Sequence, residues 1–327
     1  MNNLSSEFAS VFADTIQNFI IEKRGMGLSY DAVVEALREF DRFALSKKHM
    51  ELNLTKELME SWATDNPNHK ARTTRHKLIM IRELARYMQR IGLPAYANFQ
   101  LPKTKYNYVP YIFSDDELKL LFEQADSYTP LAIGSRKHLV VPMFLRLLYY
   151  CGLRTSDVIG LLIKDVNLKD GTLHIRHGKF DRERFVPMST SLTEYCRTYM
   201  KSAHPVPHPE DVFLPNVKNQ AFTNGGFYPT FRKLLWNAGI SHGGSGHGPR
   251  VHDLRHTFAV HKLREWVQEG RDMQVMLPYL SAYLGHKSLT ETETYLRLTP
   301  ELFPAVTNRM EKEFGDLIPE LGGVSHA

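Results

Sequence analysis

Cysteine is scarce in this 327-residue sequence, since only Cys151 and Cys196 are present. They form neither a disulfide framework nor a metal-binding spacing, which favours a reducing, cytoplasmic compartment. Long apolar runs are also missing, and none approaches the roughly 18 residues that a membrane-spanning helix requires. The first residues, M-N-N-L-S-S-E-F, lack a basic region followed by an apolar run. We therefore expect neither a signal peptide nor a membrane partner.

Acidic residues are nearly absent from residues 66–110. This segment carries nine lysines and arginines against one acid, Glu83, which gives it a net charge of +8. The whole chain has a net charge of +5 and a pI near 9.0, so positive charge is concentrated there. Such a concentration favours a polyanionic partner.

The composition is otherwise that of a globular protein, with 43% hydrophobic and 24% charged residues. The chain is long enough for two domains. We expect a helical domain over residues 1–100, a linker over residues 101–112 and a second domain over residues 113–327. The linker contains Lys103 and Lys105. These lysines would suit a linker that runs along a polyanion, but a linker that only needs to be soluble would accept them equally well.

Helical periodicity predicts helices at residues 7–24, at residues 29–48 with Ser29 as N-cap, from residue 54 to before residue 66, and at residues 73–91. At about 100° per residue, the last segment has an apolar face formed by Ile81, Leu84, Met88 and Ile91. Its opposite face carries Arg75, Arg82, Arg86 and Arg90. A solvated face is the ordinary interpretation of charges on a lone helix, but such faces mix both signs. The shortage of acids here favours phosphate binding.

The second domain combines helices with a short sheet. Ser114 and Glu117 match a capping box, and residues 139–150 are apolar on most sides, as is typical of a buried helix. Between residues 165 and 188 the apolar period changes from 3.6 to 2, which predicts about three antiparallel strands and a hairpin loop at residues 177–182. We expect a fold that is mostly α with a small antiparallel β-sheet.

A cluster of polar residues near the end of the chain points to phosphate chemistry. His252 and Arg255 are spaced to share one face of a helix, and such groups suit phosphate oxygens. Leu284-Gly285-His286 follows, and Tyr295 comes nine residues after His286. A tyrosine hydroxyl placed there is a candidate nucleophile.

Arg154 is a second candidate for binding an anion. It lies at the predicted start of a helix, where its charge opposes the helix macrodipole, so it is a poor choice for stability alone. A buried pair between Arg154 and Asp157 is the structural alternative. The two interpretations are compatible, because an acid three residues on could hold the guanidinium in place.

Five motifs, in order, resemble the tyrosine recombinase (phage integrase) family. They are G-L-R-x-S-[DE] at residues 152–157, G-K-x-x-x-x-R-x-x-P at 178–187, H-x-x-R-H at 252–256, L-G-H at 284–286 and the tyrosine at 295. The helical block before them resembles the family's core-binding domain. The departures are small: Phe180 replaces a frequent glycine, Leu296 a frequent polar residue, and the Gly-rich loop before His252 is long. The resemblance implies a helical DNA-binding domain joined to an α+β catalytic domain.

The resemblance also implies roles for particular residues. The six catalytic residues it implies are Arg154, Lys179, His252, Arg255, His286 and Tyr295. Tyr295 would attack a DNA phosphate and form a 3′-phosphotyrosine, with Lys179 as the general acid. The expected DNA contacts of the first domain and linker are Arg75, Arg82, Arg86, Arg90, Lys103 and Lys105. No metal or other cofactor is expected, because the arginines supply the positive charge. His256 and His261 are interpreted as ordinary buried or surface histidines.

The implied function is site-specific recombination of double-stranded DNA, with integration or excision of a mobile element favoured over resolution of chromosome dimers. The expected assembly is a homotetramer on two DNA sites in a bacterial nucleoid, with accessory DNA-bending or directionality proteins as further partners. Residues 300–314 are a candidate for a C-terminal helix that docks on a neighbouring subunit. The alternatives are a type IB topoisomerase, which shares the chemistry, and a regulator that binds DNA without cutting it.

Overall fold

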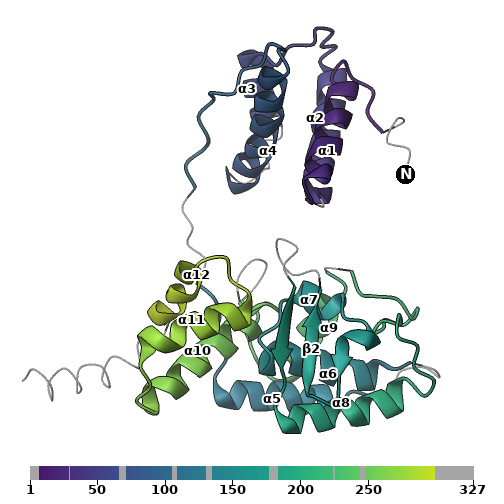
Figure 1. The fold of residues 1–327 in the computed structure, drawn as a ribbon, viewed down its shortest axis with the longest axis vertical. Coiled ribbons are helices and arrows are strands. Elements are labelled where there is room, and N and C mark those ends of the chain that lie inside the picture. Colours follow the sequence, from purple (N-terminus) through teal and green to yellow (C-terminus); the bar gives the residue numbers. More distant parts are fainter. Residues whose placement is uncertain are drawn as a thin grey trace, which may run out of the picture. The chain divides into compact units, whose positions relative to one another are not determined.

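The computed structural model describes residues 7–28, 30–65, 71–104, 109–129, 135–176, 183–223, 225–243 and 248–298. The chain divides into two compact units, residues 1–108 and residues 109–327, which we call the amino-terminal and carboxyl-terminal units (Figure 1). Across the described ranges, no helix combines the length and the apolar character that crossing a membrane demands.

The amino-terminal unit is helical. Its helices are α1 (Ala13–Gly25), α2 (Asp31–Ser46), α3 (Lys56–Thr64) and α4 (Ala71–Arg90). Helix α4 packs on α1 and α2, and its apolar face buries Ile81, Leu84 and Met88 as expected. Ile91 was wrongly included in this face: α4 ends at Arg90, and Ile91 is 48% exposed. The predicted N-cap Ser29 lies outside the described residues, and Tyr30 occupies the N-cap position of α2.

The carboxyl-terminal unit begins with α5 (Asp115–Asp126). The predicted capping box is confirmed: the Glu117 amide donates to Ser114 Oγ at 3.1 Å, and the Ser114 amide donates to the Glu117 carboxylate at 2.9 Å. Helix α6 (Lys137–Tyr150) follows and is buried on most sides, as its composition predicted. It packs against α5, α8 and α10, so it forms the centre of this unit.

A three-stranded antiparallel sheet lies beside α6, in the order β1 (Val166–Asn167), β2 (Thr172–Ile175) and β3 (Arg184–Pro187). Leu173, Ile175 and Val186 point into the core, whereas Phe185 is exposed. The change to period 2 therefore predicted these strands correctly. Arg184 pairs with Ile175 at the end where the chain enters residues 177–182, the predicted hairpin loop, which lies outside the described residues.

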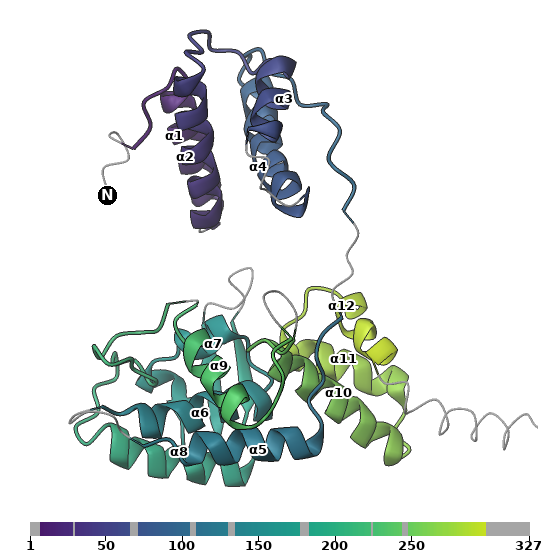
Figure 2. The same ribbon diagram turned by 180° about the vertical axis from the view of Figure 1, so that it is seen from behind.

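The remaining elements surround this core. They are α7 (Thr155–Ile159), η2 (Ile163–Asp165), α8 (Thr190–Ala203), α9 (Tyr228–Asn237), α10 (Asp253–Gln268), α11 (Met273–Leu284), α12 (Leu289–Glu293) and η3 (Thr294–Leu298). Helices α10, α11 and α12 gather at one end of the unit, and α5 and α8 run along one side in both views (Figures 1 and 2).

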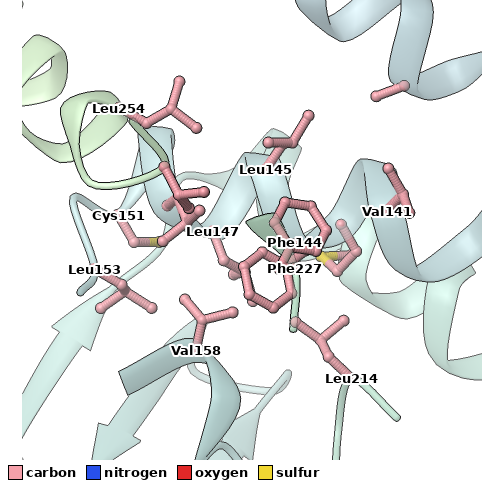
Figure 3. Packing of buried hydrophobic residues seen from close by; sticks show 14 of the residues in the cluster. Val141, Phe144, Leu145, Leu147, Cys151, Leu153, Val158, Leu214, Phe227 and Leu254 are labelled. Carbon is pink, nitrogen blue, oxygen red and sulfur yellow. The ribbon is translucent and has the colours of Figure 1, made fainter. Parts of the chain in front are cut away.

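The main core joins these parts. Phe144 of α6 stacks on Phe227 with ring centroids 3.9 Å apart, and Leu254 of α10 packs beside Cys151 at the edge of the same cluster (Figure 3). Cys151 and Cys196 are both buried free thiols. Because Leu254 is neighbour to Arg255, this packing fixes the first turn of α10 against the end of α6.

Gly152 sets how closely α6 and α10 approach. Its φ is +55°, and a Cβ at this position would lie 2.4 Å from Phe258 Cδ1. Gly152→Ala therefore combines a left-handed backbone with a clash, which should lower the free energy of unfolding by about 3 kcal/mol. Thermal unfolding should show a Tm lowered by roughly 10 °C.

Gly270→Ala is the matched control. Gly270 has φ +70° but no atom within 4 Å of the added Cβ. Gly270→Ala should lower the free energy of unfolding by only about 1 kcal/mol, which is the cost of the left-handed backbone without a clash. Equal losses in the two variants would show that contact with Phe258 does not set the position of α10.

Candidate active site

Arg255 is a fully buried arginine in the first turn of α10. It is 1% exposed, and its guanidinium donates to the carbonyl oxygens of Gly152 at 2.7 Å and Leu284 at 2.6 Å. Burial, followed by the neighbouring positive charges of Arg154 and Arg184, lowers the Arg255 pKa to about 10. Since carbonyls satisfy hydrogen bonds without cancelling charge, the site retains positive charge that an anion can neutralise.

Arg154 approaches the same end of α11. Its Nη2 donates to the Gly285 carbonyl oxygen at 2.8 Å, and its Nη1 is buried without a hydrogen-bond partner among the described residues. Burial is the main cause that lowers the Arg154 pKa. Gly285 and Leu284 end α11, where carbonyls lack partners within the helix and the macrodipole is negative. The two arginines satisfy these carbonyls and retain donors for a ligand.

Gly285 explains the glycine of the L-G-H motif. It is the C-cap of α11 with φ 66° and ψ 48°, a left-handed conformation that glycine adopts readily. A Cβ there would lie 3.1 Å from the Arg184 side chain. The turn thus presents its carbonyl to Arg154 while the Arg184 side chain lies against it.

Asp157 pairs with Arg184 of β3, rather than with the Arg154 guanidinium. Arg184 Nη2 donates to Asp157 Oδ2 at 2.6 Å, and the Asp157 side chain is fully buried. The same oxygen accepts the Arg154 backbone N–H at 3.1 Å. The side-chain pair between Arg154 and Asp157 was an open alternative from sequence. The described hydrogen bonds of the carboxylate go to the Arg154 backbone and to Arg184, although its charge still raises the Arg154 pKa. Arg184 belonged to a motif in the sequence but was not assigned to the site.

Tyr295, in η3, is 3% exposed and faces this cluster. Its hydroxyl lies 3.1 Å from His256 Nδ1. Burial raises the Tyr295 pKa, and the charges of Arg255 and Arg154 act in the opposite direction. The tyrosine is thus buried, protonated at neutral pH and held beside two guanidinium groups.

Two further histidines flank the tyrosine. The His286 ring stacks near the Tyr295 ring, with centroids 6.0 Å apart and an interplanar angle of 24°, and its Nδ1 lies 2.7 Å from Thr292 Oγ1. His252 is the N-cap of α10, and its ring lies 4.8 Å from that of His256, nearly perpendicular to it. His256 was interpreted from sequence as an ordinary histidine. Of the three histidines, it is the one with a described hydrogen bond to Tyr295.

The structure therefore brings together five of the six predicted catalytic residues: Arg154, His252, Arg255, His286 and Tyr295. Lys179 lies outside the described residues. Arg184, Asp157 and His256 were not assigned from sequence. Each of these residues lies inside or beside one of the motifs. Their position in the motifs was the sequence signal that could have identified them as site residues.

The predicted DNA contacts of the amino-terminal unit lie on and after α4. Arg86 and Arg90 are exposed and form ion pairs with Glu83 and with Glu22 of α1. Arg75 donates to the Pro102 carbonyl oxygen at 3.0 Å. Arg82 is partly buried, Lys103 is exposed, and Lys105 lies outside the described residues.

The absence of acids along this stretch of sequence is thus partly compensated in three dimensions. Glu22 comes from α1, and Glu39 of α2 pairs with Lys77. Arg90 is exposed, so its pair with Glu22 contributes little to stability. Together the pairs balance part of the positive charge of α4.

Comparison with known proteins agrees with this geometry. The model of the phage integrase family matches residues 112–301. A protein of Sinorhizobium fredii named putative integrase/recombinase is 28% identical over 324 residues, which span 94% of this chain and 99% of that protein. The tyrosine recombinase XerC of Oceanobacillus iheyensis is 30% identical over 240 residues, 70% of this chain and 71% of XerC. The crystal structure of a lambda integrase dimer bound to a core site is similar in fold, with a TM-score of 0.59 at 15% identity over 86% of this chain and 94% of that one.

Asp157→Asn tests the link between the sheet and the arginines. The change leaves the Arg184 guanidinium, 11% exposed, without its buried counter-charge. We expect the free energy of unfolding in urea to fall by about 3 kcal/mol.

Asp126→Asn provides the comparison, because Asp126 pairs with Arg146 at 2.8 Å but is 46% exposed. This change should cost less than about 1 kcal/mol. If the two substitutions cost the same, Asp157 does not hold the cluster together.

Proposed function

The chain belongs to the phage integrase family and is a tyrosine-type site-specific recombinase, and on this premise we propose that Tyr295 is the nucleophile that joins it to DNA. The observation that carries the proposal is the Tyr295 hydroxyl buried beside two arginines that are anchored by carbonyls. A buried positive site next to a hydroxyl suits attack on a phosphodiester.

Arg154 and Arg255 hold the non-bridging phosphate oxygens in this proposal. Arginine is suited to this role because its donors form a rigid planar fork and its charge is permanent. His286 donates to the phosphate, and His252 at the exposed start of α10 acts as an acid, a base or a further phosphate contact. Lys179 donates a proton to the leaving 5′ oxygen.

Covalent attachment of the enzyme to DNA preserves the energy of the broken bond. Tyr295 Oη forms a bond to phosphorus as the bond from phosphorus to the 5′ oxygen breaks, giving a 3′-phosphotyrosine. A 5′ hydroxyl from a second DNA strand then reverses the step. Strand exchange on this route needs no cofactor.

Integration or excision of a mobile element is the favoured role. The Sinorhizobium fredii protein, which aligns along nearly the whole of both chains, carries the name integrase/recombinase. Resolution of chromosome dimers is the second candidate.

Double-stranded DNA carrying recombination sites is the proposed partner, bound by the catalytic unit and by the arginine face of α4. The lambda integrase structure is a dimer on a core site. A dimer on each of two sites would give the expected homotetramer, in the cytoplasm of a bacterium, with accessory DNA-bending or directionality proteins as further partners.

Covalent trapping tests the nucleophile. The wild-type protein and Tyr295→Phe are incubated with DNA flanking the encoding gene and denatured, and DNA that remains attached is sequenced. Wild type should retain DNA with a shared junction sequence, and Tyr295→Phe should retain none. Tyr279→Phe, which alters an exposed tyrosine of α11, should behave as wild type.

The other outcomes discriminate among the alternatives. DNA attached without any common sequence would support a topoisomerase. DNA binding by both proteins without attachment would support a non-cutting regulator.

Salt dependence tests the arginine face of α4. The double variant Arg86→Ala and Arg90→Ala should bind site DNA more weakly, and the slope of log affinity against log salt should fall by about 0.9 for each phosphate that the protein no longer neutralises. Fluorescence anisotropy at several salt concentrations measures both effects.

Arg42→Ala is the control, since Arg42 of α2 is exposed in the same unit. It should leave the slope unchanged. If the double variant keeps the wild-type slope, these arginines of α4 do not contact the DNA.

A further inference from the structure

A buried tyrosine needs a proton acceptor in order to attack phosphorus. Burial raises the Tyr295 pKa above its usual value, so the hydroxyl is protonated at neutral pH. A protonated phenol is a weak nucleophile, and a base within hydrogen-bond reach is the usual remedy. The base must contact the hydroxyl oxygen itself.

His256 Nδ1 lies 3.1 Å from that oxygen, and the positive charge of Arg255 acts on the same hydroxyl. A guanidinium has no lone pair to offer and can only donate. Arg255 therefore cannot take the tyrosine proton, whereas the neutral imidazole of His256 can.

The surroundings of His256 keep its ring neutral and able to accept. The charged and titratable groups facing it are His252 and Arg255 of α10 and Tyr295 of η3. Burial is the largest cause that lowers the His256 pKa, to about 3, and His252 and Arg255 add to it. A histidine with a lowered pKa is unprotonated throughout the neutral range.

The other histidines are placed differently. The Nδ1 atom of His286 lies beside Thr292, and the contact of this residue with the tyrosine is between stacked rings. His252 is exposed at the helix N-terminus, and its described contact at this site is with the His256 ring.

We propose that His256 is the general base that takes the Tyr295 proton during DNA cleavage, an inference that rests on the proposed nucleophile. The Oη–H bond breaks and its proton moves to Nδ1, while the Oη–P bond forms and the bond from phosphorus to the 5′ oxygen breaks. The leaving oxygen receives its proton from the general acid. In rejoining, the imidazolium returns the proton to Tyr295 as the tyrosine leaves.

Bound DNA makes His256 a better base at the moment it is needed. Without DNA, burial, His252 and Arg255 oppose a positive charge on the ring. A phosphate between Arg154 and Arg255 brings negative charge, which favours the imidazolium. Proton transfer is thereby coupled to occupation of the site.

The test uses DNA sites recovered by covalent trapping, prepared with either oxygen or sulfur at the scissile 5′ bridging position. Sulfur leaves as a thiolate and needs no general acid. The full-length proteins compared are wild type, His256→Asn, His256→Ala, Lys179→Ala and His261→Asn, and the rate of adduct formation is measured.

His256→Asn and His256→Ala should cleave about 10²- to 10⁴-fold more slowly, and sulfur should not restore them because the defect lies in the nucleophile. The cleavage rate of Lys179→Ala should be restored by the sulfur substrate. Added imidazole should accelerate His256→Ala but not wild type. Asparagine can place a hydrogen-bond acceptor near the position of Nδ1 but cannot take the proton. The His256→Asn variant therefore distinguishes a general base from a residue that only accepts a hydrogen bond.

His261→Asn is the matched control. His261 is also on α10, and its Nδ1 lies 2.9 Å from the Tyr149 hydroxyl. This variant removes a similar histidine–tyrosine pair and should retain the wild-type rate. Thermal unfolding and DNA affinity, measured for every variant, separate loss of fold from loss of chemistry.

Two results would overturn the assignment while leaving Tyr295 as the nucleophile. One is a His256→Asn rate within about threefold of wild type. The other is recovery of His256→Ala with the sulfur substrate. If covalent trapping recovers no DNA attached to the wild-type protein, the proposed function is overturned instead, and the base with it.

Discussion

The buried guanidinium of Arg255 is the constraint on which the rest of the carboxyl-terminal unit depends. Removing such a charge from water is costly unless its donors are satisfied. The Gly152 and Leu284 carbonyls satisfy them, and these carbonyls belong to the end of α6 and the end of α11. One side chain thereby joins three helices that are distant in the sequence. Because the described partners are carbonyls, the positive charge persists for a ligand.

Two glycine turns make this arrangement possible. Gly152 and Gly285 both adopt positive φ, at 55° and 66°, and each lies where a Cβ would meet a neighbouring side chain. The turns bring the backbone close to Arg255, Arg154 and Arg184. The Asp157 carboxylate then balances Arg184 and caps α7. The arginines of the site are thus held largely by backbone groups.

Much of this could be predicted from the sequence, for physical reasons that differ between elements. The capping box at Ser114 and the strands near Leu173 follow from local spacing, and both are confirmed. Motif order brought Arg154, Arg255 and Tyr295 into one hypothesis, and the structure places them together.

The rest depended on contacts between distant segments. Glu22 of α1 neutralises part of the α4 face, which no count along one stretch could reveal. A pair between Asp157 and the Arg154 side chain was left open, and the sheet supplies Arg184 as the hydrogen-bond partner of this carboxylate. His256 was interpreted as an ordinary histidine, and the tyrosine that it contacts is 39 residues further along the chain.

Linkage of DNA to the tyrosine beside this arginine cluster can be measured by mass spectrometry of the trapped adduct. After digestion with protease and nuclease, we expect the peptide containing Tyr295 to carry a 3′-phosphonucleotide on that residue. A nucleotide on another tyrosine, such as Tyr279, or on a serine would show that Tyr295 is not the nucleophile.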